Sequence, residues 1–120
     1  MNGNEFIKTW RRDGFSLRLY DTGRTGDYGK ARLAYRFRDR GTLIFEGDDF
    51  FCSPMHAIDS LDCVYSLLGF LSLRPGDTDS EYFDGYTPEQ MAWCQSGRAE
   101  WLSCLVCDGE ERLSKLRYAK

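Results

Sequence analysis

Apolar and polar residues alternate with a period of two along the first third of the chain. The runs FSLRLYD, which begins at Phe15, and ARLAYRFRD, which begins at Ala31, each place large apolar residues at every second position. Successive side chains of a β-strand point to opposite faces, so both runs predict strands with one buried and one solvated face.

A tight turn at residues 39–41 (Asp-Arg-Gly) then predicts a hairpin, with TLIFEG as the partner strand. Strict alternation in that strand turns Leu43 and Phe45 toward the buried face. Residues 6–11 are expected to pair as an earlier strand across the turn at 12–14, although this segment also tolerates a helix.

The apolar spacing changes to three and four residues in the second half, which predicts helices. The first begins at a cap on Asp59 or Ser60 and ends before Arg74-Pro75-Gly76, because proline disfavours helix in the residue before it. The second begins at Thr87-Pro88-Glu89-Gln90, which has the spacing of a capping box. An interruption is expected at Asp108-Gly109, followed by further helical turns to Lys120.

Strands followed by helices, joined by short turns, predict an α+β fold. We expect a three- or four-stranded antiparallel β-meander and two main α-helices packed on one of its faces. The chain of 120 residues fits a single domain (1–120), with a sheet half at 1–50 and a helical half at 57–118. The residues expected in the core are Phe15, Leu17, Leu19, Leu33, Tyr35, Phe37, Leu43, Phe45, Val64, Leu68, Leu71, Trp101 and Leu105.

No membrane span is expected, since uninterrupted apolar runs reach four residues at most, against about 20 for a transmembrane helix. The N-terminal segment lacks the apolar stretch of a secretory signal, so we expect a cytoplasmic protein.

The net charge is −3, but basic and acidic residues are strongly segregated along the chain. Residues 1–45 carry ten Lys or Arg against five acids, whereas residues 46–111 carry two bases against fourteen acids. Such asymmetry concerns binding partners more than fold, although the charges can also simply solvate a compact domain.

Chemistry based on cysteine or histidine is poorly supported. Cys104 and Cys107 have the spacing of a metal knuckle, and Cys52 with His56 would complete a four-ligand set. Cys104 lies in an apolar helical segment instead of a glycine-bearing knuckle, so we interpret the cysteines as structural and expect no metal or other cofactor. His56 is the single histidine, and no catalytic residues are identified, so a non-enzymatic protein is expected.

The solvated face of the predicted sheet is one candidate binding surface. Basic side chains interleaved with an aromatic residue are typical of surfaces that bind single-stranded nucleic acid. If the strands pair in the predicted register, this face gathers Arg18, Tyr20, Arg32, Arg36 and Arg38.

Four segments of the central region resemble a family of small uncharacterised proteins encoded by bacterial phages, plasmids and genomic islands. They are FEGDDF (45–50), SPMHAIDS (53–60), LLGFLSLRPGDTD (67–79) and EYFDGYTPEQ (81–90). The resemblance implies a setting in a bacterial host, where small proteins of mobile elements often inhibit host machinery, as anti-CRISPR proteins do. It supplies no catalytic or binding residues.

The first expectation for function is therefore an inhibitor of a host protein, such as a CRISPR effector or another nuclease complex. Carboxylates spread over a surface can imitate a phosphate backbone, and aromatic residues among them supply interface anchors. The residues expected to form this acidic surface are Glu46, Asp48, Asp49, Asp77, Asp79, Glu81, Tyr82, Phe83, Asp84 and Tyr86. The alternative is a nucleic-acid-binding accessory protein that uses the basic sheet face.

Overall fold

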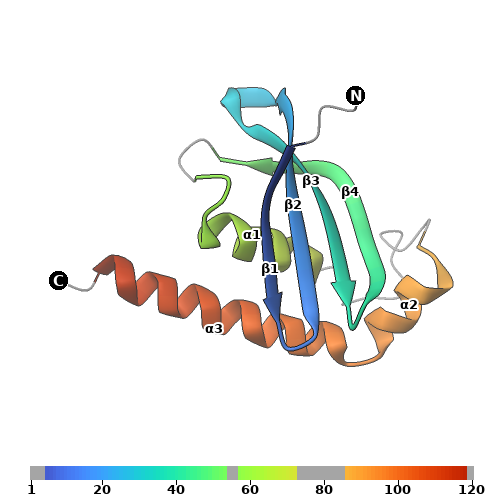
Figure 1. The fold of residues 1–120 in the computed structure, drawn as a ribbon. Helices are drawn as coiled ribbons and strands as arrows, with labels where there is room; N and C mark the ends of the chain where they lie inside the picture. Colours follow the sequence, from blue (N-terminus) through green and yellow to red (C-terminus); the bar gives the residue numbers. More distant parts are fainter. Residues whose placement is uncertain (1–4, 54–56, 73–85, 119–120) are drawn as a thin grey trace. The chain divides into compact units, whose positions relative to one another are not determined.

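Strands occupy the first half of the chain and helices the second, as the change in apolar spacing predicts (Figure 1). The structure is a computed structural model that describes residues 5–53, 57–72 and 86–118. Its elements are β1 (Glu5–Arg12), β2 (Phe15–Thr25), a single 3₁₀ turn (Asp27–Gly29), β3 (Ala31–Asp39), β4 (Thr42–Cys52), α1 (Leu61–Ser72), α2 (Pro88–Gln95) and α3 (Arg98–Tyr118). This order confirms the α+β class and the antiparallel meander followed by helices.

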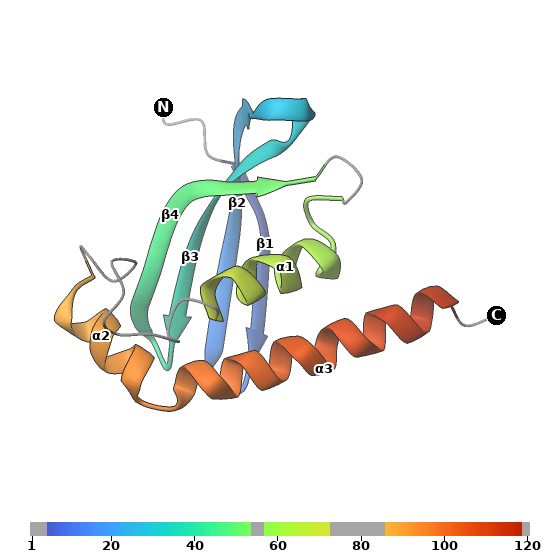
Figure 2. The ribbon, with the colours of Figure 1, turned by 180° about the vertical axis from the view of Figure 1, so that it is seen from behind.

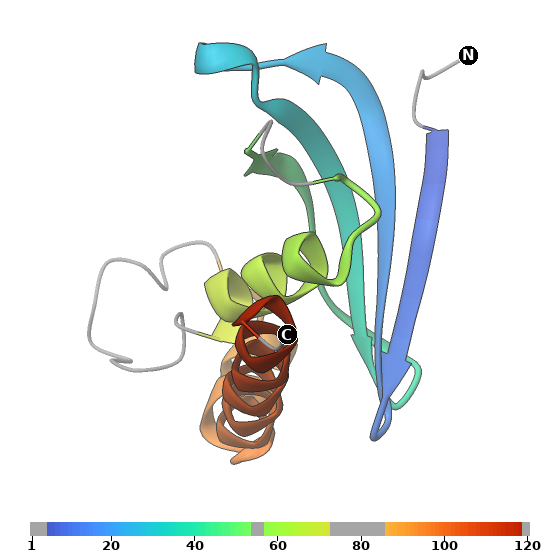
Figure 3. The same cartoon turned by 90° about the vertical axis from the view of Figure 1, so that its left-hand side faces the viewer.

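The four strands pair with their neighbours in the sequence, in the order β1-β2-β3-β4 (Figure 2). Two-residue turns join β1 to β2 and β3 to β4. Both residues of each turn have positive φ: 52° and 87° at Asp13 and Gly14, 51° and 85° at Arg40 and Gly41. This conformation matches the right-handed twist of the flanking strands, which is visible in Figure 3. Residues 5–12 are therefore a strand and not a helix.

One face of the sheet is apolar and buried. Leu17 and Leu19 of β2 and Leu33 and Phe37 of β3 are fully buried, as their alternation predicts. The Phe37 ring stacks between Phe15 and Phe45, with ring centroids 5.8 and 6.5 Å away. These rings bind β2, β3 and β4 together through side chains, in addition to the backbone hydrogen bonds of the sheet.

A bulge in β4 overturns the expected position of Leu43. Phe45 pairs with Phe37, but Leu43 pairs with Arg38, which leaves Ile44 as an extra residue in β4. An extra residue reverses the alternation, so Ile44 and Phe45 are both buried and Leu43 is 39% exposed. The inward orientation expected for Leu43 is therefore wrong.

Side-chain caps begin the helices where the sequence predicts them. The Ser60 hydroxyl accepts a hydrogen bond from the Cys63 N–H (3.1 Å), immediately before α1. At α2, the Thr87 hydroxyl accepts from the Gln90 N–H, and the Gln90 amide oxygen accepts from the Thr87 N–H. This reciprocal pair satisfies two N–H groups that the first turn of a helix leaves without partners.

The break in the second helical region lies elsewhere than expected. Three helices are present in the described residues instead of two, because α2 ends before Gly97. Gly97 has φ +83°, a left-handed conformation that glycine adopts without strain and that ends many helices. The interruption expected at Asp108-Gly109 is wrong, because α3 runs through both residues.

Most of the expected core is buried. Apart from Leu43, the exception is Trp101, whose side chain is 46% exposed on α3. The residues confirmed as buried are Phe15, Leu17, Leu19, Leu33, Tyr35, Phe37, Phe45, Val64, Leu68, Leu71 and Leu105.

The chain divides into two compact units, Met1–Val64 and Tyr65–Lys120. Within the second, α1 and α3 approach closely at two glycines. Gly109 of α3 is buried against the Tyr65 ring of α1, where an added Cβ would overlap the ring. At Gly69 of α1, an added Cβ would lie 3.7 Å from Val106 Cγ1 of α3, an ordinary contact. None of the helices in the described residues is both long and apolar enough to cross a membrane.

Candidate nucleic-acid interface

The second face of the sheet, which we call the polar face, is assembled by cross-strand register. Arg18 of β2 pairs with Arg36 of β3, which in turn pairs with Glu46 of β4. One step along the strands, Tyr20 pairs with Phe6 of β1 on one side and with Ala34 on the other. The structure thus brings together Arg18, Tyr20 and Arg36, as the sequence predicts.

Arginine and aromatic side chains contact one another at the centre of this face. The Arg18 guanidinium lies 5.1 Å from the centroid of the Phe6 ring and 6.0 Å from that of Tyr20. The Arg36 guanidinium lies 5.6 Å from the Tyr20 centroid. Phe6 and Tyr20 meet edge to face at 5.9 Å. Such cation–π contacts hold guanidinium groups over flat rings while leaving their N–H donors available. We call Phe6, Arg18, Tyr20 and Arg36 the aromatic–arginine cluster.

Arg32 and Arg38 flank this cluster on β3. The Arg32 side chain donates two hydrogen bonds to Asp48, to its carbonyl oxygen (2.6 Å) and to its carboxylate (3.1 Å). It also lies 5.9 Å from the Phe51 ring centroid. Arg38 faces the same way, opposite Ser16 of β2. All five predicted residues of the basic face therefore lie on the polar face.

Acidic residues neutralise only part of this face. Glu46 lies 3.9 Å from Arg36, an exposed and loose ion pair, and Asp48 pairs with Arg32. Within residues 5–53, 57–72 and 86–118, neither Arg18 nor Arg38 has a carboxylate within ion-pair distance. With Arg11, which pairs with Ser16, the polar face carries five arginines against two acids. Its local charge is therefore positive even though the chain is acidic.

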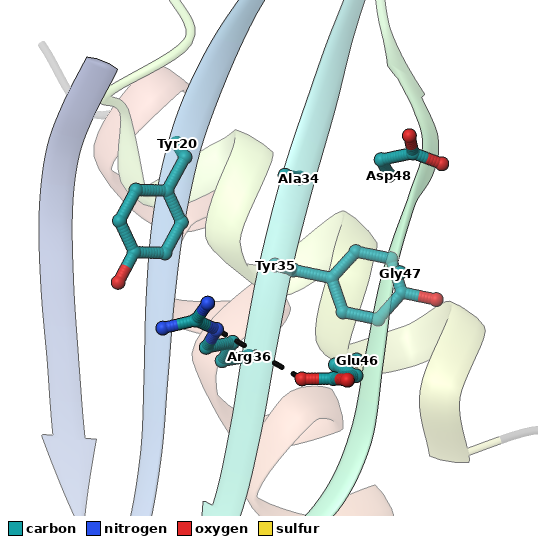
Figure 4. Close-up of a pocket in the computed structure, with 7 residues that line it drawn as sticks. All are labelled: Tyr20, Ala34, Tyr35, Arg36, Glu46, Gly47 and Asp48. Atoms are coloured by element: carbon teal, nitrogen blue, oxygen red, sulfur yellow. Dashed lines mark ion pairs between the residues drawn. The ribbon is translucent and has the colours of Figure 1, made fainter. Parts of the chain in front are cut away.

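A hollow of about 490 Å³ opens beside Tyr20 and Arg36. In Figure 4 the Arg36 guanidinium points toward Tyr20, and Glu46 points toward Arg36 from β4. Small residues leave the space: Ala34 lies cross-strand from Tyr20, and Gly47 has no side chain. The hollow is lined by Tyr20, Ala34, Tyr35, Arg36, Glu46, Gly47 and Asp48.

Sequence reasoning missed two aromatic residues of the polar face. Phe6 is 50% exposed and Phe51 is 44% exposed. Phe6 joins the face only through the pairing of β1 with β2, and β1 is an ambiguous strand in the sequence. Phe51 follows a second bulge in β4. The strand pairs are Tyr35 with Gly47 and then Leu33 with Phe50, so Asp48 and Asp49 both lie opposite Ala34. Simple alternation does not predict the face of Phe51.

The expected acidic surface is only partly within the described residues. There, Glu46 and Asp48 pair with arginines, and Asp49 accepts a hydrogen bond from the Tyr35 hydroxyl (3.3 Å). Tyr86 is partly buried, immediately before the Thr87 cap. The residues that lie outside the described parts are Asp77, Asp79, Glu81, Tyr82, Phe83 and Asp84.

The described cysteines do not assemble a metal site. No group of three or more His, Cys, Asp or Glu side chains that could hold a metal ion occurs within the described ranges. His56 lies outside them. Cys52 and Cys63 are buried and share a side-chain hydrogen bond, whereas Cys104 and Cys107 are exposed on α3. Burial raises the pKa of the Cys63 thiol above its ordinary value, and the hydrogen bond with Cys52 raises it further.

We expect two thiols of the native protein to react quickly with an aromatic disulfide reagent at pH 8. The thiolate is the reactive form, so the raised pKa and burial of Cys63 suppress its reaction until the pH is raised further or the protein unfolds. Absorbance of the released thiol measures the count, and the Cys104→Ser/Cys107→Ser variant should lose the fast phase. A fast phase that persists in this variant would contradict the burial of Cys52, Cys63 and Cys94.

Comparison with protein-family models, curated proteins and solved structures gives no match to this chain.

Proposed function

We propose that the protein binds single-stranded nucleic acid on the polar face of its sheet. The observation that carries this proposal is the aromatic–arginine cluster, in which Arg18 and Arg36 lie over aromatic rings on a solvated surface. Guanidinium planes and aromatic rings both stack on unpaired bases, and the arginine N–H groups bind phosphate oxygens.

The shape of the surface favours single strands over duplexes. A four-stranded sheet presents a broad face on which splayed bases can lie flat, with Tyr20, Phe6 and Phe51 as stacking surfaces. A duplex keeps its bases stacked inside, out of reach of such rings. The described residues include no helix among the elements of this face, so no groove-reading helix supports a duplex proposal.

Local charge supports binding to phosphates. Arg18 and Arg38 are available for phosphate contacts because no carboxylate of the described residues neutralises them, whereas Arg32 is held by Asp48. Because each phosphate contact releases condensed counterions, affinity is expected to fall as salt rises. The net charge of −3 lowers non-specific attraction, so binding depends on this face and not on the whole surface.

Fluorescence anisotropy with labelled single-stranded DNA and RNA of about 12 nucleotides tests the proposal, since single-strand site sizes are about 4–16 nucleotides. Tyr20→Ala should weaken binding by about 1–3 kcal/mol, the range for one base–aromatic stack. Arg18→Ala should weaken binding and reduce the salt slope by about one.

Arg112→Ala is the matched control, because it removes the same charge from α3. Thermal unfolding of each variant checks that it is folded. If the parent binds no single strand at low salt, or if Tyr20→Ala and Arg18→Ala bind as tightly as Arg112→Ala, the proposal is wrong.

Inhibition of a host nuclease complex through the acidic surface stays a prediction, as does the resemblance to proteins of mobile elements. We rank nucleic-acid binding above inhibition because Glu46 and Asp48 pair with arginines. These pairs partly neutralise two carboxylates of the expected acidic surface.

A further inference from the structure

We infer that the hollow on the polar face is a pocket that selects guanine among the bases of a bound single strand. This inference rests on the proposed function, and it adds a base preference that stacking by itself does not give. Three features carry it: the size of the hollow, the packing of its rim on β4, and the order of donors and acceptors along its wall.

The hollow has the dimensions of a ligand pocket and one aromatic wall. Its volume of about 490 Å³ lies within the range of about 300–1,000 Å³ for small-molecule pockets. Tyr20 stands at one side and Ala34 beside it, so a flat base that enters over Ala34 meets the Tyr20 ring and the Arg36 guanidinium next to it (Figure 4). The opposite side is β4, with Glu46 and Asp48.

The β4 side is held in place by Tyr35. A Cβ at residue 47 would lie 2.8 Å from the Tyr35 hydroxyl oxygen and 3.1 Å from Asp49 Oδ1, so only glycine fits there without displacement. The same hydroxyl donates to Asp49. The bulge therefore separates two adjacent acids: Asp49 binds Tyr35, while Asp48 lines the hollow. This packing fixes the backbone of the rim, from which the Glu46 and Asp48 side chains project.

The wall of the hollow presents a donor beside an excess of acceptors. The Arg36 guanidinium donates N–H groups, and the Glu46 carboxylate 3.9 Å away only accepts. Asp48 adds a second carboxylate, one oxygen of which already accepts from Arg32. A complementary base must offer a carbonyl next to more than one N–H group.

Guanine meets this requirement better than the other bases. Its pairing edge carries the O6 carbonyl, then N1–H, then the N2 amino group, so O6 faces Arg36 while both nitrogens donate to Glu46. Guanine O6 is also one of the two acceptors, with N7, in the commonest specific arginine–base contact of protein–DNA complexes. Adenine and cytosine present one amino group beside an acceptor nitrogen, and uracil presents a single N–H between two carbonyls. Each of them leaves a carboxylate of the wall facing an acceptor, which costs affinity.

The test compares single strands of adenosines that carry one central guanosine, inosine or adenosine. Inosine keeps O6 and N1–H but lacks the N2 amino group, so it isolates one hydrogen bond to Glu46. We expect the parent to bind the guanosine strand about tenfold more tightly than the inosine strand, as for loss of one hydrogen bond to a charged group. Glu46→Gln should bring this ratio close to one, because the amide replaces one accepting oxygen with an NH2 donor, which cannot accept from the N2 amino group.

Glu111→Gln on α3 is the matched control and should leave the ratio unchanged. The ratio, rather than the affinity, is the readout, because removing any acid strengthens binding to phosphates in general. If the three strands bind alike, or if Glu46→Gln keeps the full ratio, guanine selection is overturned while the proposed function stands. If no strand binds at all, the proposed function itself fails, and this inference fails with it.

Discussion

Replacing Leu33 with Asp is expected to unfold the sheet. Leu33 is fully buried near the start of β3, opposite Asp21 on β2 and Phe50 on β4. The substitution removes buried apolar surface worth about 2–3 kcal/mol and places a charge there without a counterion. It also sets two carboxylates directly across from each other at Asp21. A loss above about 4 kcal/mol is close to the whole stability of a small domain.

Arg36→Ala is the control on the same strand. Its side chain is exposed on the polar face, and its ion pair with Glu46 is long at 3.9 Å. Exposed pairs of this kind contribute about 0–1 kcal/mol, so the melting temperature should change little. Circular dichroism during thermal and urea unfolding measures both variants. If Arg36→Ala proves the more damaging substitution, the assignment of the two sheet faces is wrong.

Alanine at Gly109 is expected to destabilise the helical unit by about 2 kcal/mol, within the usual range for overpacking a core. The added Cβ would overlap the Tyr65 ring, a rigid group that has to move as a whole. This cost exceeds the gain of up to about 1 kcal/mol that alanine brings to a helix interior.

Gly69→Ala, in the same pair of helices, is expected to stabilise the protein instead. Its Cβ would rest 3.7 Å from Val106 Cγ1, so the helix gains propensity without a clash. We expect an increase in unfolding free energy of up to about 1 kcal/mol. Urea unfolding of both variants gives the comparison, and a similar loss at both glycines would contradict the close approach of α3 to Tyr65.

Gly97 and Gly109 show where sequence reasoning fails in the helices. A glycine in a helical pattern either ends the helix or allows a close contact, and nothing in the local sequence distinguishes the two. At Gly97 the backbone turns left-handed and the helix ends. At Gly109 the helix continues because a ring from another helix occupies the space of the missing side chain.

The amino-acid sequence by itself determined the elements that depend on neighbours along the chain. Alternation in β2 and β3 placed Arg18, Tyr20 and Arg36 on one face, since side-chain direction follows the strand period. The turn at Arg40-Gly41 and the capping box at Thr87 rest on residues within a few positions of one another. Each of these was predicted correctly.

Only the tertiary structure decided the features that depend on pairing between strands. The bulges of β4 exist because two residues there share one partner on β3, and they set the faces of Leu43, Asp48 and Phe51. Phe6 reaches Arg18 only through the register of β1 against β2. The hollow likewise depends on pairing, because its lining residues come from β2, β3 and β4. Register is set by the backbone hydrogen bonds between two paired strands, so the residue pattern along one strand does not determine it.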